Sequence, residues 1–190
     1  MKPITEAELR QTVRERLEKR AARGGRVQEE LTIEQGGARA DLALCGNLLE
    51  AYELKSDSDS FARLHNQIHA YNRVFDRITL VITEKHEAAA LAIAPYWWGI
   101  WCAARLKSGN VIIDQRRRAQ AHQHQDPYSL ASLLWRDEAA ALLNDAGLGP
   151  IPSRTTRVQL YERLSVALGF ERLREHVMDA LAQRKASAAA

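Results

Sequence analysis

Residues 48–83 place two kinds of hydrophobic periodicity side by side. The segment "LLEAYELK" (48–55) alternates as a strand does, and "RITLVIT" (77–83) is an apolar run typical of a buried strand. From about Asp59 the intervening apolar residues recur at the spacing of one helix face: Leu64, Ile68, Tyr71 and Phe75. A strand, a helix and a second apolar strand in this order predict a crossover connection, in which both strands are parallel and interior.

The surrounding segments extend this crossover into a larger sheet. Amphipathic or apolar helical patterns cover residues 5–22 and 84–94, and strand patterns cover 26–33, 38–44, 98–105 and 110–115. The turn "CGN" joins the strand at 38–44 to the one at 48–55, so the first three strands are expected to form an antiparallel meander. The prediction for residues 1–120 is therefore an α/β domain with a mixed sheet flanked by helices.

The pattern changes after the polar stretch "RRRAQAHQHQDPYS". Helices are predicted over residues 129–146, 154–168 and 170–184, with "GLGPIPS" as a loop between the first two. These helices make up a C-terminal helical module, assigned to residues 126–186.

Composition excludes several classes of protein. The N-terminal 25 residues are charged throughout and contain neither a signal peptide nor a membrane span, so we expect a cytoplasmic protein with no membrane partner. The two cysteines, Cys45 and Cys102, are too few for a disulfide framework or a four-cysteine metal site, and are expected to be small buried residues. No Gly-rich phosphate loop or nucleophile elbow is present, which argues against ATP-driven and acyl-transfer chemistry.

Three charged residues fall on strands that are otherwise apolar. Asp41 lies in "ARADLAL", and Glu53 and Lys55 share one face of the next strand, because side chains alternate along a strand. Burying such groups unpaired would cost several kcal/mol, on the order of 2–7 for each neutral polar group and more for a charge. The carboxylates of Asp41 and Glu53, with the backbone carbonyl of Leu54, would supply the hard oxygen ligands that Mg²⁺ prefers. Lys55 would then lie beside a metal-bound water and a phosphoryl oxygen. Mn²⁺ is a possible substitute for Mg²⁺.

The order of these residues resembles a known nuclease motif. Asp41, followed by Glu53-Leu54-Lys55, is similar to the motif of the PD-(D/E)xK nuclease superfamily, with Ala40 in place of a proline that is often absent. Gln67 and Tyr71 in "QIHAY" resemble the Gln-x-x-x-Tyr motif that follows the lysine in RecB-like nucleases.

The resemblance extends over most of the chain. The stretches "RADLAL…YELKSDSDSFARLHNQIHAYNRVFD…LVI", "YWWGIW" and "LLWRDEAAALL" are similar to an uncharacterised bacterial and phage family, named after a myxobacterial locus and assigned to this superfamily. The resemblance implies a restriction-endonuclease-like core and Mg²⁺-dependent hydrolysis of phosphodiesters. It also implies that Gln67 and Tyr71 support the catalytic site.

Further residues are candidates for the metal shell and for the substrate. In the superfamily a glutamate on or after the first helix often joins the metal site; here Glu30 is the first choice, with Glu29 and Glu34 as alternatives. Five arginines are candidate phosphate contacts: Arg39, Arg63, and Arg116, Arg117 and Arg118 in what resembles a loop. A basic run is equally typical of a solvated surface.

The leading prediction is a Mg²⁺-dependent nuclease that hydrolyses DNA, with DNA repair, phage biology or mobile-element defence as candidate settings. The alternative is a catalytically silent module on a nuclease fold that binds DNA or protein. A homodimer, and a partner protein bound through the C-terminal helices, are further possibilities. The sequence does not decide between endonuclease and exonuclease.

Overall fold

The computed structural model describes residues 2–184 of the 190-residue chain. Its centre is one six-stranded sheet whose strands lie in the same order in space as in sequence. They span Arg26–Ile33 (β1), Ala38–Cys45 (β2), Leu49–Lys55 (β3), Arg77–Thr83 (β4), Gly99–Arg105 (β5) and Val111–Arg117 (β6). Strand β4 is parallel to β3 and to β5, and the other neighbours are antiparallel. The predicted α/β class with a mixed sheet is confirmed.

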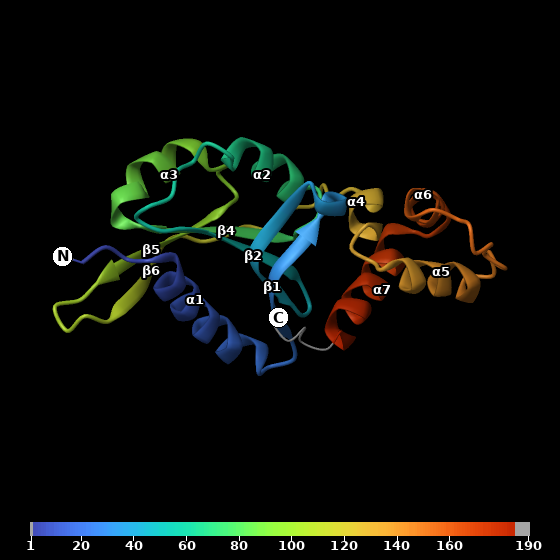
Figure 1. The fold of residues 1–190 in the computed structure, drawn as a ribbon, viewed down its shortest axis with the longest axis horizontal. Coiled ribbons are helices and arrows are strands. Elements are labelled where there is room, and N and C mark those ends of the chain that lie inside the picture. The colour runs from blue at the N-terminus through green and yellow to red at the C-terminus, as the bar shows by residue number, and fades with distance from the viewer. Residues whose placement is uncertain (1, 185–190) are drawn as a thin grey trace.

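Helices cover both faces of the sheet. Helix α1 (Glu6–Ala21) lies on one face, and α2 (Leu64–Asn72) and α3 (Glu87–Ile93) lie on the other (Figure 1). Short 3₁₀ turns, η1 (Glu34–Gly36) and η2 (Glu84–His86), join strands to their neighbours. Two apolar clusters follow from this layering, because alternate residues of each strand face opposite helices. One cluster joins α1 to the sheet, and the other joins the opposite face to α2 and the C-terminal helices.

The crossover from β3 to β4 through α2 is confirmed, but α2 begins at Leu64 and not near Asp59 as predicted. The stretch "SDSDS" folds into a turn, in which the Asp59 carboxylate accepts hydrogen bonds from the Ser56 amide at 2.8 Å and the Ser56 hydroxyl at 2.6 Å. Such local bonds compete with helix formation. Arg63, expected on the helix, is therefore the residue just before it.

Four helices follow the sheet: α4 (Pro127–Ala131), α5 (Arg136–Asp145), α6 (Arg157–Ala167) and α7 (Phe170–Gln183). The prediction of a single helix over 129–146 is wrong, because the helix is interrupted between α4 and α5. There the Glu138 carboxylate accepts a hydrogen bond from the Trp135 amide at 2.6 Å and caps the start of α5. The last two residues of the predicted module, 185 and 186, lie outside the described residues.

The C-terminal helices share an apolar core with the sheet. Leu160 of α6 and Leu173 of α7 belong to the same buried cluster as Leu49 of β3. An ion pair adds to this contact. Arg174 of α7 donates at 2.9 Å to the carboxylate of Asp76, the residue just before β4. The division at residues 120 to 126 stays a prediction, and the helices pack directly on the sheet.

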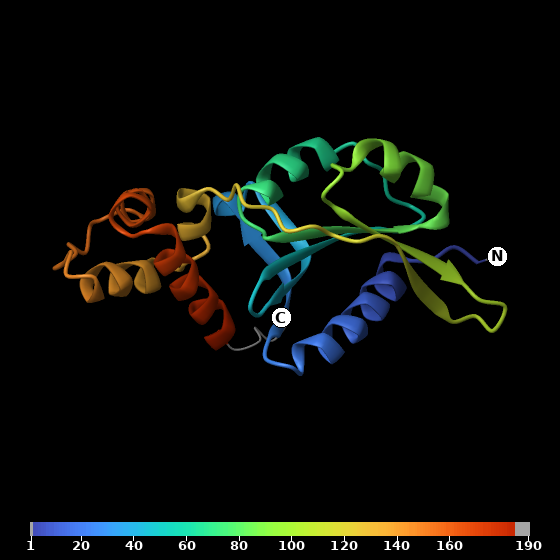
Figure 2. The same cartoon turned by 180° about the vertical axis from the view of Figure 1, so that it is seen from behind.

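The segment after β6 returns along the core before the helical region begins (Figure 2). Its backbone is held at several points, including the Gln120 amide to the Trp97 carbonyl and the Asp126 amide to the Arg73 carbonyl, at 2.9 and 2.8 Å.

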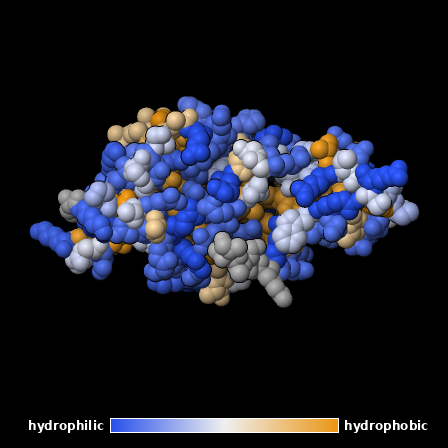
Figure 3. All heavy atoms as spheres, viewed as in Figure 1, coloured by the Kyte–Doolittle hydropathy of each residue, from blue (hydrophilic) through white to orange (hydrophobic). Residues whose placement is uncertain are grey.

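The face of the molecule in Figure 3 is mostly hydrophilic, and apolar atoms gather on it over α3. Within residues 2–184, no helix combines the length and the apolar character that crossing a bilayer requires.

Candidate functional site

The site lies where two central strands stop pairing. The antiparallel ladder between β2 and β3 runs from Cys45–Leu49 to Leu42–Tyr52 and ends there. The next two residues, Asp41 and Glu53, face each other across the end of the ladder. The Asp41 carboxylate accepts a hydrogen bond from the Leu54 amide at 2.8 Å, taking the place of a ladder bond. The short turn after β2 thus places two carboxylates next to each other, as the sequence predicted.

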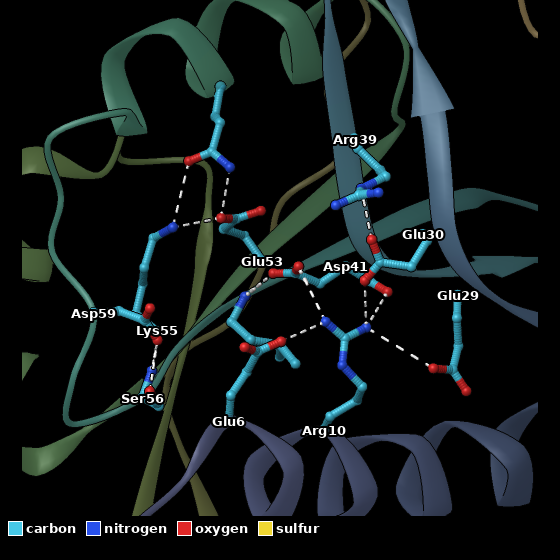
Figure 4. A network of polar contacts seen from close by, with 12 residues as sticks. Glu6, Arg10, Glu29, Glu30, Arg39, Asp41, Glu53, Lys55, Ser56 and Asp59 are labelled. Carbon is cyan, nitrogen blue, oxygen red and sulfur yellow. Dashed lines mark hydrogen bonds and ion pairs between the residues drawn. The ribbon is translucent and has the colours of Figure 1, made fainter. Parts of the chain in front are cut away.

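Glu53 is the centre of a buried hydrogen-bond network. Its side chain is 2% exposed, and its Oε1 lies 2.6 Å from both the Lys55 ammonium and the Gln67 side-chain amide. Its Oε2 lies 2.6 Å from the Tyr71 hydroxyl. The Lys55 ammonium is also 3.5 Å from Gln67 Oε1, which closes a triangle between β3 and α2 (Figure 4). Glu53 therefore contacts three of the other four predicted catalytic residues directly.

Tyr71 also anchors α2 to a second strand. Its hydroxyl lies 2.8 Å from the backbone carbonyl of Arg39 in β2, besides its contact with Glu53 in β3. The ring is fully buried between Phe75 and Trp98. This position fixes the orientation of the Glu53 carboxylate.

A cavity of about 360 Å³ opens onto this network. Besides predicted residues, among them Glu30 of β1, it is lined by Glu6 and Arg10 of α1. A larger cavity of about 480 Å³ lies elsewhere, lined by Lys2, Asp57 and Arg105 among others. None of the residues predicted to carry chemistry lines the larger cavity, so the smaller one is the candidate site.

Arg10 is a site residue that the sequence did not indicate. Its guanidinium reaches from α1 to the Asp41 carboxylate at 3.4 Å and to the Asp41 carbonyl oxygen at 3.0 Å (Figure 4). It also pairs at 2.8 Å with Glu6 and at 2.8 Å with Glu30. The only local signal is Glu6 four residues earlier, an ordinary helical pair.

Glu30 is the glutamate that the structure brings to the cavity. It lies opposite Asp41 in β1, with a backbone φ of 54°, in the left-handed region that residues other than glycine seldom adopt. Its carboxylate bridges Arg10 at 2.8 Å and Arg39 at 2.6 Å. Of the alternatives, Glu29 pairs with Arg14 at 2.8 Å and makes only a long contact with Arg10, at 3.9 Å, and Glu34 pairs with Arg73 at 3.3 Å.

The electrostatics of the site favour an added positive charge. Burial, together with the neighbouring Glu53 carboxylate, raises the pKa of Asp41 from its usual range to about 6. Burial and the same carboxylate hold the pKa of the Tyr71 phenol well above its usual value, so that Tyr71 remains a hydrogen-bond donor. Negative charge at Asp41 is thus only partly offset by Arg10 and Lys55.

Comparison with known proteins assigns the chain to a family. The sequence model of the family described as bacteriophage P4 protein cII matches residues 2–189. The chain belongs to that family.

Two individual proteins are similar to this chain. Protein cII of Enterobacteria phage P4 is 24% identical over 157 residues, which are 82% of this chain and 58% of the phage protein. The chain thus spans little more than half the length of that relative. Among solved structures, SPO1766, a protein of unknown function from Silicibacter pomeroyi, is similar at 21% identity and a TM-score of 0.45, over 74% of this chain and 94% of that one. The expected association with phage proteins is confirmed, and the nuclease superfamily stays a prediction.

The basic run is not at the cavity of this P4 cII family member. Arg116 and Arg117 are in β6 and not in a loop as predicted, and β6 is separated from β3 by β4 and β5. Arg116 pairs with Glu87 at 3.0 Å, and Arg117 donates to the Trp98 carbonyl at 2.7 Å. Arg118 is exposed. Arg39 and Arg63, in contrast, line the cavity.

The donor set is suited to a hard cation held by few protein ligands. No three His, Cys, Asp or Glu side chains between residues 2 and 184 form a group that could hold a metal ion alone. Asp41 and Glu53 with the Leu54 carbonyl would be the protein ligands, and Glu30 is near enough to Asp41 to share its partner Arg10. Mg²⁺ is commonly bound through one or two carboxylates, with water and substrate phosphate as the other ligands. The residues present therefore fit Mg²⁺, but not a closed metal centre.

Proposed function

We propose that the protein is a Mg²⁺-dependent nuclease of the PD-(D/E)xK type, which hydrolyses phosphodiester bonds of DNA. The observation that carries the proposal is the Glu53 carboxylate, held by Lys55, Gln67 and Tyr71 beside Asp41. A buried lysine between a carboxylate pair and an open cavity is an expensive arrangement unless it acts there, because ion pairs of this kind gain little net stability.

Each residue has a defined part in this proposal. Asp41, Glu53 and the Leu54 carbonyl would hold Mg²⁺, which when bound polarises the phosphoryl oxygen and lowers the pKa of a bound water. Lys55 is positioned to orient the attacking water or to stabilise negative charge on the phosphate. Gln67 and Tyr71 hold Glu53 in place.

Substrate phosphates would bind at the cavity mouth. The Arg39 side chain is 65% exposed and Arg63 is exposed, so both can meet a phosphodiester there. The membership of a phage family favours a role in phage or mobile-element DNA metabolism.

A second function is favoured by one observation. The charged groups proposed to hold the metal and the attacking water already have partners within the chain: Glu53 pairs with Lys55, and Asp41 pairs with Arg10. A network that is satisfied in this way could stabilise a fold that binds DNA or protein without cutting it.

Cleavage assays separate the two functions. Labelled linear, closed circular, single-stranded and branched DNA are incubated with the purified chain in Mg²⁺, Mn²⁺ or chelator. Parallel reactions use Lys55→Met and Asp41→Asn, with Lys107→Met, an exposed lysine outside the cavity, as the matched control. Circular dichroism verifies that each variant is folded.

The nuclease requires metal-dependent cutting that falls by at least ~100-fold in the two site variants and is unchanged in the control. Cutting of the closed circle would establish an endonuclease. DNA binding without cutting would leave the binding module as the function. Equal cutting by Lys55→Met and the parent would refute the assignment of the reaction to this site.

A further inference from the structure

Arg10 forms an ion pair with Asp41, one of the two carboxylates that the proposed reaction needs for its metal, and with the neighbouring Glu30. We infer that Arg10 is the resident cation of this cluster, that Mg²⁺ must displace it from Asp41, and that the displaced guanidinium then binds a substrate phosphate. This inference rests on the proposed function and adds a substrate-binding residue to it.

The first argument is the geometry of Arg10. One guanidinium nitrogen, Nη1, lies 2.8 Å from Glu30 and 3.0 Å from the Asp41 carbonyl oxygen. The other, Nη2, lies 2.8 Å from Glu6 and 3.4 Å from the Asp41 carboxylate. Its side chain is 19% exposed. The guanidinium thus lies between the carboxylates, as a bound cation would.

The second argument is the distribution of the other positive charges. Lys55 pairs with Glu53, and Arg39 pairs with Glu30. In the described part of the chain, Arg10 is the one side chain that forms an ion pair with Asp41. A divalent cation that binds Asp41 would therefore lie close to the Arg10 guanidinium. Two cations about 4 Å apart repel each other even in a polar site, so Arg10 must move away.

The distances indicate which contact would be given up. Arg10 lies 2.8 Å from both Glu6 and Glu30, whereas its contacts with the carboxylates of Asp41 and Glu29 are longer, at 3.4 and 3.9 Å. Asp41 keeps its bond from the Leu54 amide when Arg10 leaves, so the carboxylate remains aimed at the cavity. Release of Arg10 requires rotation of one long side chain and no movement of the sheet.

Displacement also gives Arg10 a new partner. Arg39 and Arg63 line the same cavity, so a third guanidinium there would complete a cluster able to bind a phosphodiester by paired hydrogen bonds. A phosphate that attracts Arg10 would make metal binding easier, and by linkage the metal would strengthen phosphate binding by the same factor. Metal and DNA are then expected to bind cooperatively.

The first test is calorimetric titration of Mn²⁺ into the full chain without nucleic acid. Arg10→Gln removes the charge and keeps part of the stem. Arg14→Gln, one turn along α1, is the matched control, because Arg14 pairs with Glu18 and Glu29 and not with Asp41. We expect Arg10→Gln to lower the Mn²⁺ dissociation constant by at least ~10-fold and Arg14→Gln to change it by less than ~2-fold. If Arg10→Gln does not fold, Arg10→Lys should keep the weak affinity of the parent.

The second test measures binding of a labelled DNA oligonucleotide by anisotropy in a Lys55→Met background. With Mn²⁺, adding Arg10→Gln should weaken DNA binding by about 5- to 10-fold and reduce the salt slope by about one. With EDTA, where Arg10 stays on the carboxylates, the two proteins should bind DNA equally.

The outcomes separate the two proposals. If the parent binds Mn²⁺ in an Asp41-dependent manner and Arg10→Gln binds it no better, the displacement of Arg10 is refuted and the nuclease site stands. If no variant shows Asp41-dependent binding of Mn²⁺, both the displacement and the proposed metal-dependent function are refuted. An equal loss of DNA affinity with Mn²⁺ and EDTA would make Arg10 a permanent DNA contact and would also refute displacement.

Discussion

Replacing Asp41 by Asn should stabilise the metal-free protein at neutral pH. Asp41 has a pKa raised to about 6 by burial and by the Glu53 carboxylate, and its side chain is 24% exposed. At pH values between the pKa of Asp41 in the unfolded chain and its pKa of about 6 in the fold, the folded protein binds more protons at Asp41 than the unfolded chain does. The free energy of unfolding therefore falls as the pH rises through this window.

The magnitude follows from the size of the shift. Ionising Asp41 in the fold costs at most about 3 kcal/mol, the product of 1.36 kcal/mol per pKa unit and the difference between about 6 and the usual 3.8. Asn keeps an acceptor for the Leu54 amide, and the attraction between Arg10 and the Asp41 carboxylate is already contained in the net shift. Solvent screening at the partly exposed side chain reduces the cost below this upper bound. The net gain at pH 8 is about 1–2 kcal/mol, or about 2–8 °C in Tm for a chain of this size.

Urea unfolding with EDTA at pH 4.5 and pH 8 measures this effect. The advantage of Asp41→Asn should be small at pH 4.5 and fully developed at pH 8. Asp57→Asn is the control with the opposite sign, because the Ile4 amide and the Thr83 hydroxyl lower the pKa of Asp57 despite its burial. Its ionised form stabilises the fold at any pH above the unfolded pKa, and both pH values lie above it, so Asp57→Asn should cost stability at pH 4.5 and pH 8 to nearly the same extent.

Saturating Mn²⁺ should reverse the order of parent and variant. A ligand at 100 times its dissociation constant stabilises the folded state by about 2.7 kcal/mol, and only the parent keeps the Asp41 carboxylate. If Asp41→Asn is less stable than the parent at both pH values in EDTA, ionising Asp41 in the fold does not carry the proposed cost.

Two further predictions concern other parts of the network. Tyr71→Phe removes a donor from the buried Glu53 side chain and should cost about 2–3 kcal/mol in urea unfolding. Tyr161→Phe removes a hydroxyl that donates to a neutral backbone carbonyl at 2.8 Å and should cost about 1 kcal/mol. Equal losses would argue against a stronger hydrogen bond from Tyr71 to Glu53. Arg117→Ala should lower Tm by several degrees, about 1–2 kcal/mol, because it removes the Arg117 donor from the Trp98 carbonyl and one of the two donors from the Pro95 carbonyl, which keeps the Trp98 amide. It should leave any DNA affinity unchanged. A loss of DNA affinity with unchanged Tm would contradict the structural assignment of Arg117.

The sheet was predictable because its signals are local. Strand alternation and apolar runs located each strand to within about two residues, and the short turn after Cys45 fixed Asp41 beside Glu53. Gln67 and Tyr71 were assigned to the site only through the resemblance to the Gln-x-x-x-Tyr motif, whose two residues lie one helical turn apart.

The missed features depend on contacts between distant segments or on local bonds that oppose a helix. Arg10 reads as an exposed helical residue, and its partners Glu30 and Asp41 come from two strands whose register the sequence does not give. The start of α2 was placed too early because Asp59 bonds back to Ser56. The preference for Glu30 over Glu29 could not be settled by alternation, because Glu30 adopts a left-handed backbone conformation within its strand.

The early end of the β2–β3 ladder gives the site a natural reporter in hydrogen exchange. The Leu54 amide belongs to a central strand, yet its acceptor is the side chain of Asp41 and not a carbonyl of β2. Its exchange with deuterated solvent is therefore governed by the state of one carboxylate, whereas the amides that bond within the ladder exchange only when the sheet opens. One amide resonance can thus follow protonation or cation binding at Asp41 with no substrate present.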